Sequence, residues 1–108
     1  MAKKRAQTVT EALEAASRDA RERHYTLRLY VAGLTPRSQE AIRTVTTICE
    51  ERLAGRYDLE VIDIYLHPVL AKGEQIIAVP TLIKKLPLPL RKMIGNMAAI
   101  DKVLVAWT

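Results

Sequence analysis

The chain has 108 residues, and its 17 Lys and Arg against 12 Asp and Glu give a formal net charge of +5 at pH 7. This length fits one domain, and a hydrophobic content of 49% is enough for a core, which excludes a wholly disordered chain. The sequence contains no run of about 18 apolar residues, so we expect no transmembrane helix. Its beginning has no apolar signal segment, so we expect a cytoplasmic protein.

Residues 1–24 differ in composition from the rest of the sequence. They are rich in Ala, Arg and Glu and contain no aromatic residue. Thr8 and Glu11 have the spacing of a capping box, but the apolar stripe of this segment is thin, and an isolated helix of this length is marginal in water. We predict a flexible or partly helical extension over residues 1–24 and a folded domain over residues 25–108.

The domain begins with a predicted strand, helix and strand. Alternating apolar residues indicate a strand over residues 25–32. Thr35 can cap a helix that starts with Pro36, and the apolar face of this helix runs to Leu53. Residues 57–66 predict a second strand, whose nearly continuous apolar residues suggest burial on both faces. These elements form a right-handed βαβ unit with parallel strands.

The next segment predicts a short helix and a hairpin. Residues 68–71 can form the helix. Pro80 removes an N–H donor from an apolar run, so we place it just before a strand that begins at Thr81. Residues 91–94 can return as an antiparallel strand, which ends at Gly95.

The last apolar segment fits two structures, because its spacing is helical while its β-branched valines suit a strand. The spacing favours a helix, which gives the order βαβαββα of a thioredoxin-like α/β fold. The residues at helical spacing are Met97, Ile100, Val103, Leu104 and Trp107.

Few residues in the chain carry reactive chemistry. Cys49 is the single cysteine, which excludes an internal disulfide, and with two histidines it leaves too few ligands for a zinc site. Neither His24 nor His67 has a Ser or Cys neighbour in sequence, and we expect Asp63 to form hydrogen bonds at a strand end. The glycines stand singly, so no phosphate-binding loop is present. We therefore predict a protein that is not an enzyme, with no catalytic residue, metal or cofactor.

The positive charge raises the alternative of a nucleic-acid partner. The basic residues are dispersed, and the chain has no Phe, four Tyr and one Trp, which are few platforms for stacking bases. Arg28 and Tyr30 share one face of the first strand, but such a face is more often solvated or covered by a helix. Nucleic acid is therefore the less favoured partner.

The sequence before the predicted hairpin resembles the cis-proline segment of thioredoxin-like proteins. Val79 and Thr81 flank Pro80, and the cis form costs only about 0.5–1 kcal/mol before proline. Redox thioredoxins need a Cys-x-x-Cys motif at the start of the first helix, where this chain has no cysteine in residues 35–38. Disulfide exchange is therefore excluded, and we expect Cys49 to be buried and unreactive.

Several short motifs follow one another in a distinctive order. They are Leu29-Tyr30-Val31-Ala32-Gly33, Thr35-Pro36, Val61-Ile62-Asp63, Pro80-Thr81-Leu82, Leu86-Pro87-x-Pro89 and Ile94-Gly95. From about Tyr25 to Trp107 the sequence resembles the KaiB family of circadian-clock proteins. The resemblance implies a non-enzymatic regulator that binds the KaiC ATPase ring and opposes the phosphorylation promoted by KaiA, so KaiA is a further candidate partner.

The resemblance also implies two alternative folds, which differ after the second strand. One is a tetramer-forming βαββααβ state, and the other is the thioredoxin-like, binding-competent monomer. Ala106 stands where the family has Gly, and Ala is more favourable than Gly in a helix by up to ~1 kcal/mol. Trp107 adds an apolar side chain that can anchor the helix. We expect mainly the thioredoxin-like monomer, with the tetramer as the alternative.

The resemblance places candidate partner-binding residues on two segments. The family has a basic residue where this chain has Glu40, and Arg43 keeps a cation one turn later. Lys72 and Gln75 fall in a stretch that is typically Glu-Glu-Asp-Lys in the family. We predict Arg43, Lys72 and Gln75 as partner-binding residues. The predicted structural residues are Pro80, Gly95 and Trp107.

The main protein partner has two candidates. One is a KaiC-type ATPase. The other is a different signalling protein, because the sensor domain of the clock kinase SasA shares this fold and a Trp-containing final helix.

Overall fold

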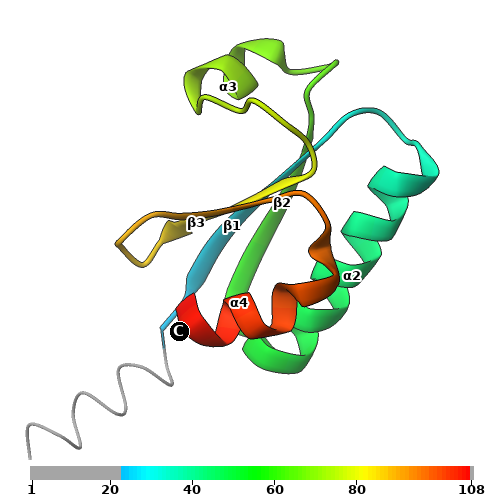
Figure 1. Cartoon of the computed structure of the whole chain (residues 1–108). Coiled ribbons are helices and arrows are strands. Elements are labelled where there is room, and N and C mark those ends of the chain that lie inside the picture. The colour runs from blue at the N-terminus through cyan, green and yellow to red at the C-terminus, as the bar shows by residue number, and fades with distance from the viewer. Residues whose placement is uncertain (1–22, 108) are drawn as a thin grey trace, which may run out of the picture.

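The computed structural model describes residues 23–107, so most of the predicted extension over residues 1–24 lies outside the described residues. The order βαβαββα is confirmed, and the last apolar segment is a helix (Figure 1). The elements are β1 (Tyr25–Val31), α2 (Pro36–Leu53), β2 (Tyr57–Asp63), α3 (Pro68–Gly73), β3 (Thr81–Leu86), β4 (Arg91–Ile94), a 3₁₀ turn η1 (Met97–Ala99) and α4 (Ile100–Trp107).

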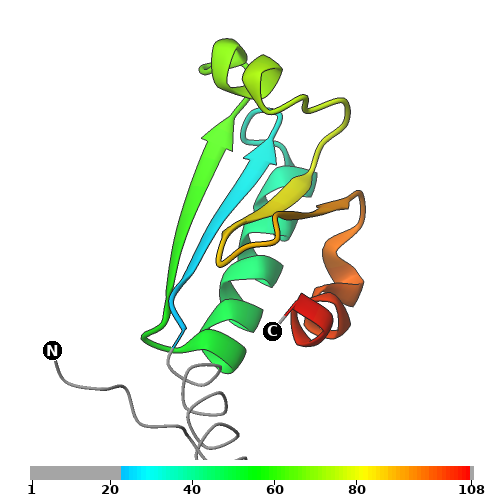
Figure 2. The ribbon, with the colours of Figure 1, turned by 90° about the vertical axis from the view of Figure 1, so that its left-hand side faces the viewer.

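The four strands form one sheet in the order β2-β1-β3-β4. β1 is parallel to β2 and antiparallel to β3, and β3 is antiparallel to β4. Figure 2 shows that α2 and α4 cover the same face of the sheet, while α3 lies past the end of β1 and β2. We call the face under α2 and α4 the helical face and the other one the open face.

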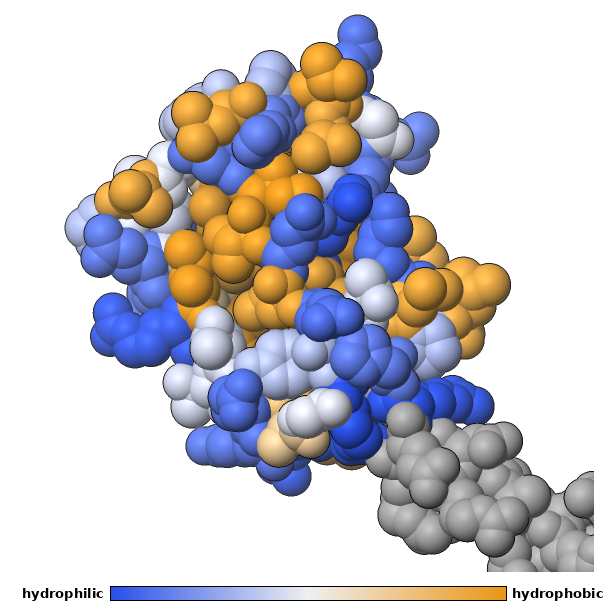
Figure 3. Space-filling view, turned by 180° about the vertical axis from the view of Figure 1, so that it is seen from behind, coloured by the Kyte–Doolittle hydropathy of each residue, from blue (hydrophilic) through white to orange (hydrophobic). Residues whose placement is uncertain are grey.

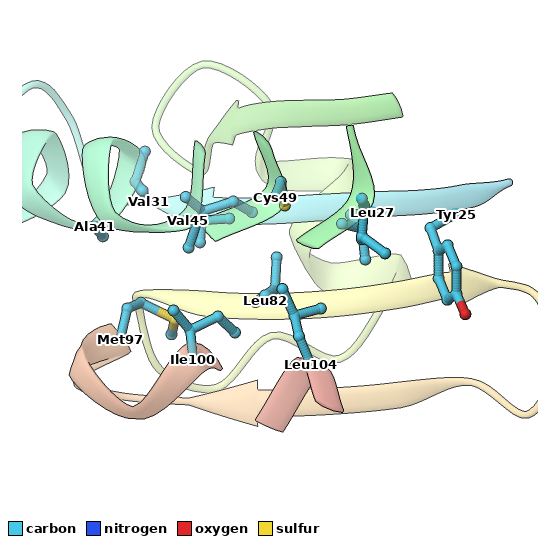
Figure 4. Close-up of a cluster of buried hydrophobic side chains, with 12 residues drawn as sticks. Tyr25, Leu27, Val31, Ala41, Val45, Cys49, Leu82, Met97, Ile100 and Leu104 are labelled. Carbon is cyan, nitrogen blue, oxygen red and sulfur yellow. The ribbon is translucent and has the colours of Figure 1, made fainter. Parts of the chain in front are cut away.

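The main core lies on the helical face. Alternation along β1 points Tyr25, Leu27, Leu29 and Val31 toward this face, where α2 and α4 cover them. Figure 4 shows Tyr25, Leu27 and Val31 in one cluster with side chains of α2 and α4. Complete burial of an aliphatic or aromatic side chain contributes about 1.5–3 kcal/mol, so this cluster is the largest source of stability. The other fully or nearly fully buried members are Ala41, Val45, Cys49, Leu53, Leu82, Met97, Ile100 and Leu104.

Local hydrogen bonds explain where the elements begin. The hydroxyl of Thr35 accepts a hydrogen bond from the Ser38 amide at 3.1 Å, which caps α2, and Pro36 occupies its first turn. The Asn96 side chain likewise accepts from the Ala98 amide at 2.9 Å and starts the turn that leads into α4. The peptide bond before Pro80 is cis, as the sequence predicts.

The prediction that the second strand is buried on both faces is wrong. β2 is an edge strand, so it has a single neighbour, and Val61 remains 41% exposed while Ile62 is its buried residue. The strand also ends at Asp63 rather than Leu66. The Asp63 carboxylate accepts hydrogen bonds from the amides of Gly33 at 3.1 Å and Tyr65 at 2.9 Å, which turns the chain and gives Asp63 its predicted strand-end role.

Candidate protein-docking surface

Exposed apolar side chains gather where β1 and β2 end. They come from the loop after β1, the turn after β2, α3 itself and the connection to β3, and the most exposed are Ile77 at 87% and Val69 at 81%. Large exposed apolar groups that cluster in this way mark interaction sites. Figure 3, which views the open face, shows apolar atoms at this end of the molecule. We call the following residues the α3 patch: Leu34, Tyr65, Leu66, Val69, Leu70 and Ile77.

The end of α3 has a defined geometry. The Ile76 amide donates to the Ala71 carbonyl at 2.9 Å, and the Gln75 amide donates to the Lys72 carbonyl at 3.1 Å. These are the two hydrogen bonds of a Schellman motif, a helix end that requires one residue in the left-handed backbone conformation. Here that residue is Gln75, with φ 57°. Glycine is the usual residue at such a position, so the backbone of Gln75 is strained.

One side of α3 packs on the open face of the sheet. Ala71 belongs to a second apolar cluster with Tyr30, Ile62 and Ile83, and Ile76 packs against this cluster. The exposed side of α3 carries part of the α3 patch. The helix is therefore anchored at a single buried residue and presents the rest of its apolar surface outward.

Charged groups join the end of α3 to three strands. The Glu74 carboxylate accepts hydrogen bonds from the Arg28 guanidinium on β1 and from Lys85 Nζ on β3, the latter at 3.0 Å. Its backbone carbonyl accepts from Lys92 Nζ on β4 at 2.8 Å. Arg28 Nε also donates to the Glu60 carboxylate on β2 at 2.7 Å. We call these residues the Glu74 hub: Arg28, Glu60, Glu74, Lys85 and Lys92.

The electrostatic environment of Glu74 favours its charged form. Burial raises the pKa of this carboxyl, but the hydrogen bond from Lys85 and the charges of Lys85 and Arg28 outweigh burial and lower the pKa below its ordinary value. The Glu74 side chain is only 16% exposed, so these contacts are less screened than those of a surface ion pair.

The structure brings two of the three predicted partner-binding residues together. Lys72 and Gln75 are exposed on the α3 segment, next to the α3 patch. Arg43 is exposed on α2, which covers the other face of the sheet, and it forms an ion pair with Glu40 at 3.5 Å. The sequence did not predict the patch itself, because exposure of its apolar residues depends on where α3 lies.

The predicted structural residues Pro80, Gly95 and Trp107 lie at the ends of β3, β4 and α4. The Pro80 carbonyl accepts from the Gly95 amide at 2.9 Å, and Gly95 has φ 96°, a backbone conformation that favours glycine. The Trp107 carbonyl accepts from Lys84 Nζ at 3.2 Å. Lys84 was not predicted as a core residue, although it alternates with Leu82 on β3 and so points to the helical face.

The open face offers little to a nucleic acid. Tyr30 is fully buried, so its ring cannot stack on a base, and the Arg28 guanidinium is engaged by Glu60 and Glu74.

The groups that could carry chemistry are inert or dispersed. Burial raises the pKa of the Cys49 thiol to about 11, so the thiol is protonated at neutral pH.

A pocket of about 320 Å³ lies between α2 and η1, and its lining includes Arg37, Glu40 and Met97. Within residues 23–107, no group of three His, Cys, Asp or Glu side chains could hold a metal ion, and no helix could span a membrane.

Comparison with known structures supports the fold. The Drosophila melanogaster thioredoxin Deadhead superposes with a TM-score of 0.66 at 13% identity, over 96% of this chain and all of that chain (100%). The N-terminal domain of Synechococcus elongatus SasA superposes with a TM-score of 0.65 at 18% identity, over 99% of this chain and 90% of that chain. The fold is therefore thioredoxin-like.

Comparison of sequences shows the family. Residues 28–108 match the KaiB domain family. The chain is 49% identical over 81 residues to the circadian clock oscillator protein KaiB of Gloeothece citriformis, across 75% of this chain and 76% of that protein. It is 48% identical over 81 residues to the protein of the same name from Synechococcus elongatus, across 75% and 79%. The chain belongs to the KaiB family.

Proposed function

We propose that this chain is a non-enzymatic regulator that binds a KaiC-type ATPase ring in its thioredoxin-like state and modulates phosphorylation of the ring. Its relatives are named circadian clock oscillator proteins, which supports a role in a clock-like cycle. The observation that carries the proposal is the α3 patch, where the most exposed large apolar side chains of the described residues, Ile77 and Val69, lie at one end of the fold.

The composition of the α3 patch suits a protein partner. Apolar side chains such as Val69 and Ile77 lose the most water-accessible area when a partner covers them, and each Å² contributes about 25 cal/mol. Lys72 and Gln75 supply polar groups at its margin, as in interfaces with an apolar centre and a polar rim. We propose that Arg43, on α2, contributes a separate charged contact.

The place of the single cysteine supports a role without disulfide exchange. Cys49 is buried in the core, and residues 35–38, where redox thioredoxins have their cysteines, are Thr, Pro, Arg and Ser. His24 contacts Asp58 at 2.6 Å, but both side chains are more than half exposed, as in an ordinary surface pair.

The thioredoxin-like state also supports a mainly monomeric protein. α4 buries Ile100 and Leu104 against the core of its own chain, so these residues are satisfied without a second subunit. We propose that Pro80, Gly95 and Trp107 stabilise this state through the contacts at β3, β4 and α4.

The test is co-elution of the full chain with a purified KaiC-type ring in the presence of ATP. We expect a complex at tens of micromolar, and we expect Val69→Asp to weaken it at least tenfold because it places a charge in the α3 patch. Leu88→Asp is the matched control, since Leu88 is also largely exposed, at 72% against 81% for Val69, but lies in the β3–β4 turn. Absence of a complex with the wild-type chain, or equal losses in both variants, would contradict the proposal.

A signalling adaptor is the second candidate function. The likeness to the SasA domain over 99% of the chain favours it. We expect such an adaptor to capture its partner in a pull-down and to lose it when the extension, residues 1–24, is removed. Capture of the KaiC-type ring by both forms of the chain would exclude this alternative.

A further inference from the structure

We propose that Glu74 is a positioning residue that holds α3 on the sheet, so that loss of its charge releases α3 while the rest of the domain stays folded. For the consequence at the partner, this inference rests on the proposed function of the α3 patch. Its first step concerns the free protein alone and is tested there.

Apolar packing is a weak anchor for α3. The helix has six residues, and Ala71 is its buried one. An isolated helix of this length is unstable in water, because too few hydrogen bonds repay the ordering of its first turn. Contacts outside the helix must therefore decide whether it stays in place.

The Glu74 hub supplies these contacts. Glu74 receives donors from β1, β3 and β4, which are three adjacent strands of the sheet. Hydrogen bonds between ionised partners are about twice as strong as neutral ones, and those to Glu74 are partly shielded from water. Without the charge of Glu74, Lys85 would lose this carboxylate partner and Arg28 would keep that of Glu60, while the bond from Lys92 to the Glu74 backbone carbonyl would remain.

The place of Glu74 in its own helix supports a tertiary role. It stands at the C-terminal end of α3, where the helix dipole disfavours a negative charge. The following residue, Gln75, adopts φ 57° in place of the usual glycine. Local helix stability therefore explains neither residue, whereas the contacts of Arg28 on β1 and Lys85 on β3 explain the carboxylate.

The test is amide hydrogen exchange of the full chain at pH 7, for the wild type, Glu74→Gln and Glu60→Gln. We expect the Ala71 and Ile76 amides to exchange about tenfold faster in Glu74→Gln, which corresponds to about 1.4 kcal/mol. Glu60→Gln is the matched control, because Glu60 also bonds Arg28 but belongs to β2 and not to the end of α3. Amides of β1 and α2 should keep their wild-type rates in both variants.

Two further measurements separate positioning from a general loss of stability. Raising the salt from about 0.1 M to about 1 M shortens the Debye length from about 10 Å to about 3 Å, so it should speed α3 exchange in the wild type and hardly in Glu74→Gln. Glu74→Asp, which keeps the charge, should restore most of the protection. Unchanged α3 exchange in Glu74→Gln, equal effects of both Gln variants, or faster exchange throughout the domain would overturn the inference.

The binding assay distinguishes this inference from the proposed function. If Glu74→Gln loosens α3 and also weakens binding to the KaiC-type ring, both are supported. If α3 loosens while the ring binds as before, the positioning role stands and the α3 patch is not the binding surface. If α3 exchange is unchanged, the positioning role fails whatever the ring does.

Discussion

The two faces of the sheet hold their helices in different ways. On the helical face, α4 buries Ile100 and Leu104 in the main apolar core. On the open face, α3 buries Ala71 and is otherwise joined to the strands by the Glu74 hub. Apolar burial changes little with salt or pH, whereas the contacts of charged groups depend on both. The two helices should therefore respond to different conditions and different substitutions.

Each face also has one charged side chain that is mostly buried. Lys84 is 2% exposed on the helical face, and its Nζ donates to the Trp107 carbonyl at the end of α4. A cation is favoured at a helix C-terminus, but Arg91 is its cross-strand neighbour and repels it. Glu74, by contrast, is paired with the opposite charges of Arg28 and Lys85, so burying its charge costs less free energy than burying that of Lys84.

The largest effect is expected from Leu104→Ala, which removes a fully buried side chain that joins α4 to the core. A cavity of this kind lowers the free energy of unfolding by about 2–5 kcal/mol, measured by denaturant titration. Val105→Ala, at an exposed position of the same helix, should cost about 0.5 kcal/mol or less. Equal effects at both positions would mean that α4 does not pack on the sheet in solution.

Lys84→Met should have a smaller effect of opposite sign. The substitution replaces a buried charge by an apolar side chain of similar length, so we expect a gain of about 1 kcal/mol in the free energy of unfolding at pH 7. Lys102→Met, at an exposed position on α4, is the control and should change stability by about 0.5 kcal/mol or less. A large loss of stability in Lys84→Met would instead show that its hydrogen bond to α4 outweighs the cost of burial.

The pH dependence of the same variant sharpens this comparison. Burial, followed by the charges of Arg91 and Arg23, lowers the pKa of Lys84 from 10.5. Between the lowered value and 10.5 the unfolded state binds more protons, so Lys84 makes stability rise with pH in this window. The raised pKa values of Cys49 and Tyr57 act in the opposite direction, but they are present in both proteins. The advantage of Lys84→Met over the wild type should therefore shrink as the pH approaches 10.5.

Periodicity predicted the helical face better than the open face. The spacing of Ile100, Leu104 and Trp107 identified α4. The apolar residues of an amphipathic helix recur every three to four positions, whichever element the helix packs against. The burial of β2 was wrongly predicted, since an apolar run does not tell whether a strand lies at an edge. Lys84 could have been placed in the core from the alternation of β3. Glu74 could not, because its partners are distant in sequence and meet it only once α3 is in place.

The smallest effect is expected from Gln75→Gly, which tests the end of α3 rather than its hub. Glycine adopts the observed φ of 57° without strain, and its added freedom in the unfolded chain offsets part of the gain. We expect the Ala71 and Ile76 amides to exchange about two- to threefold more slowly, a gain of about 0.5 kcal/mol. Gln75→Ala, which removes the same polar group but keeps the strain, should not slow exchange. If both variants weaken binding to the ring equally although only one stabilises α3, then the Gln75 side chain, and not the rigidity of α3, makes the contact.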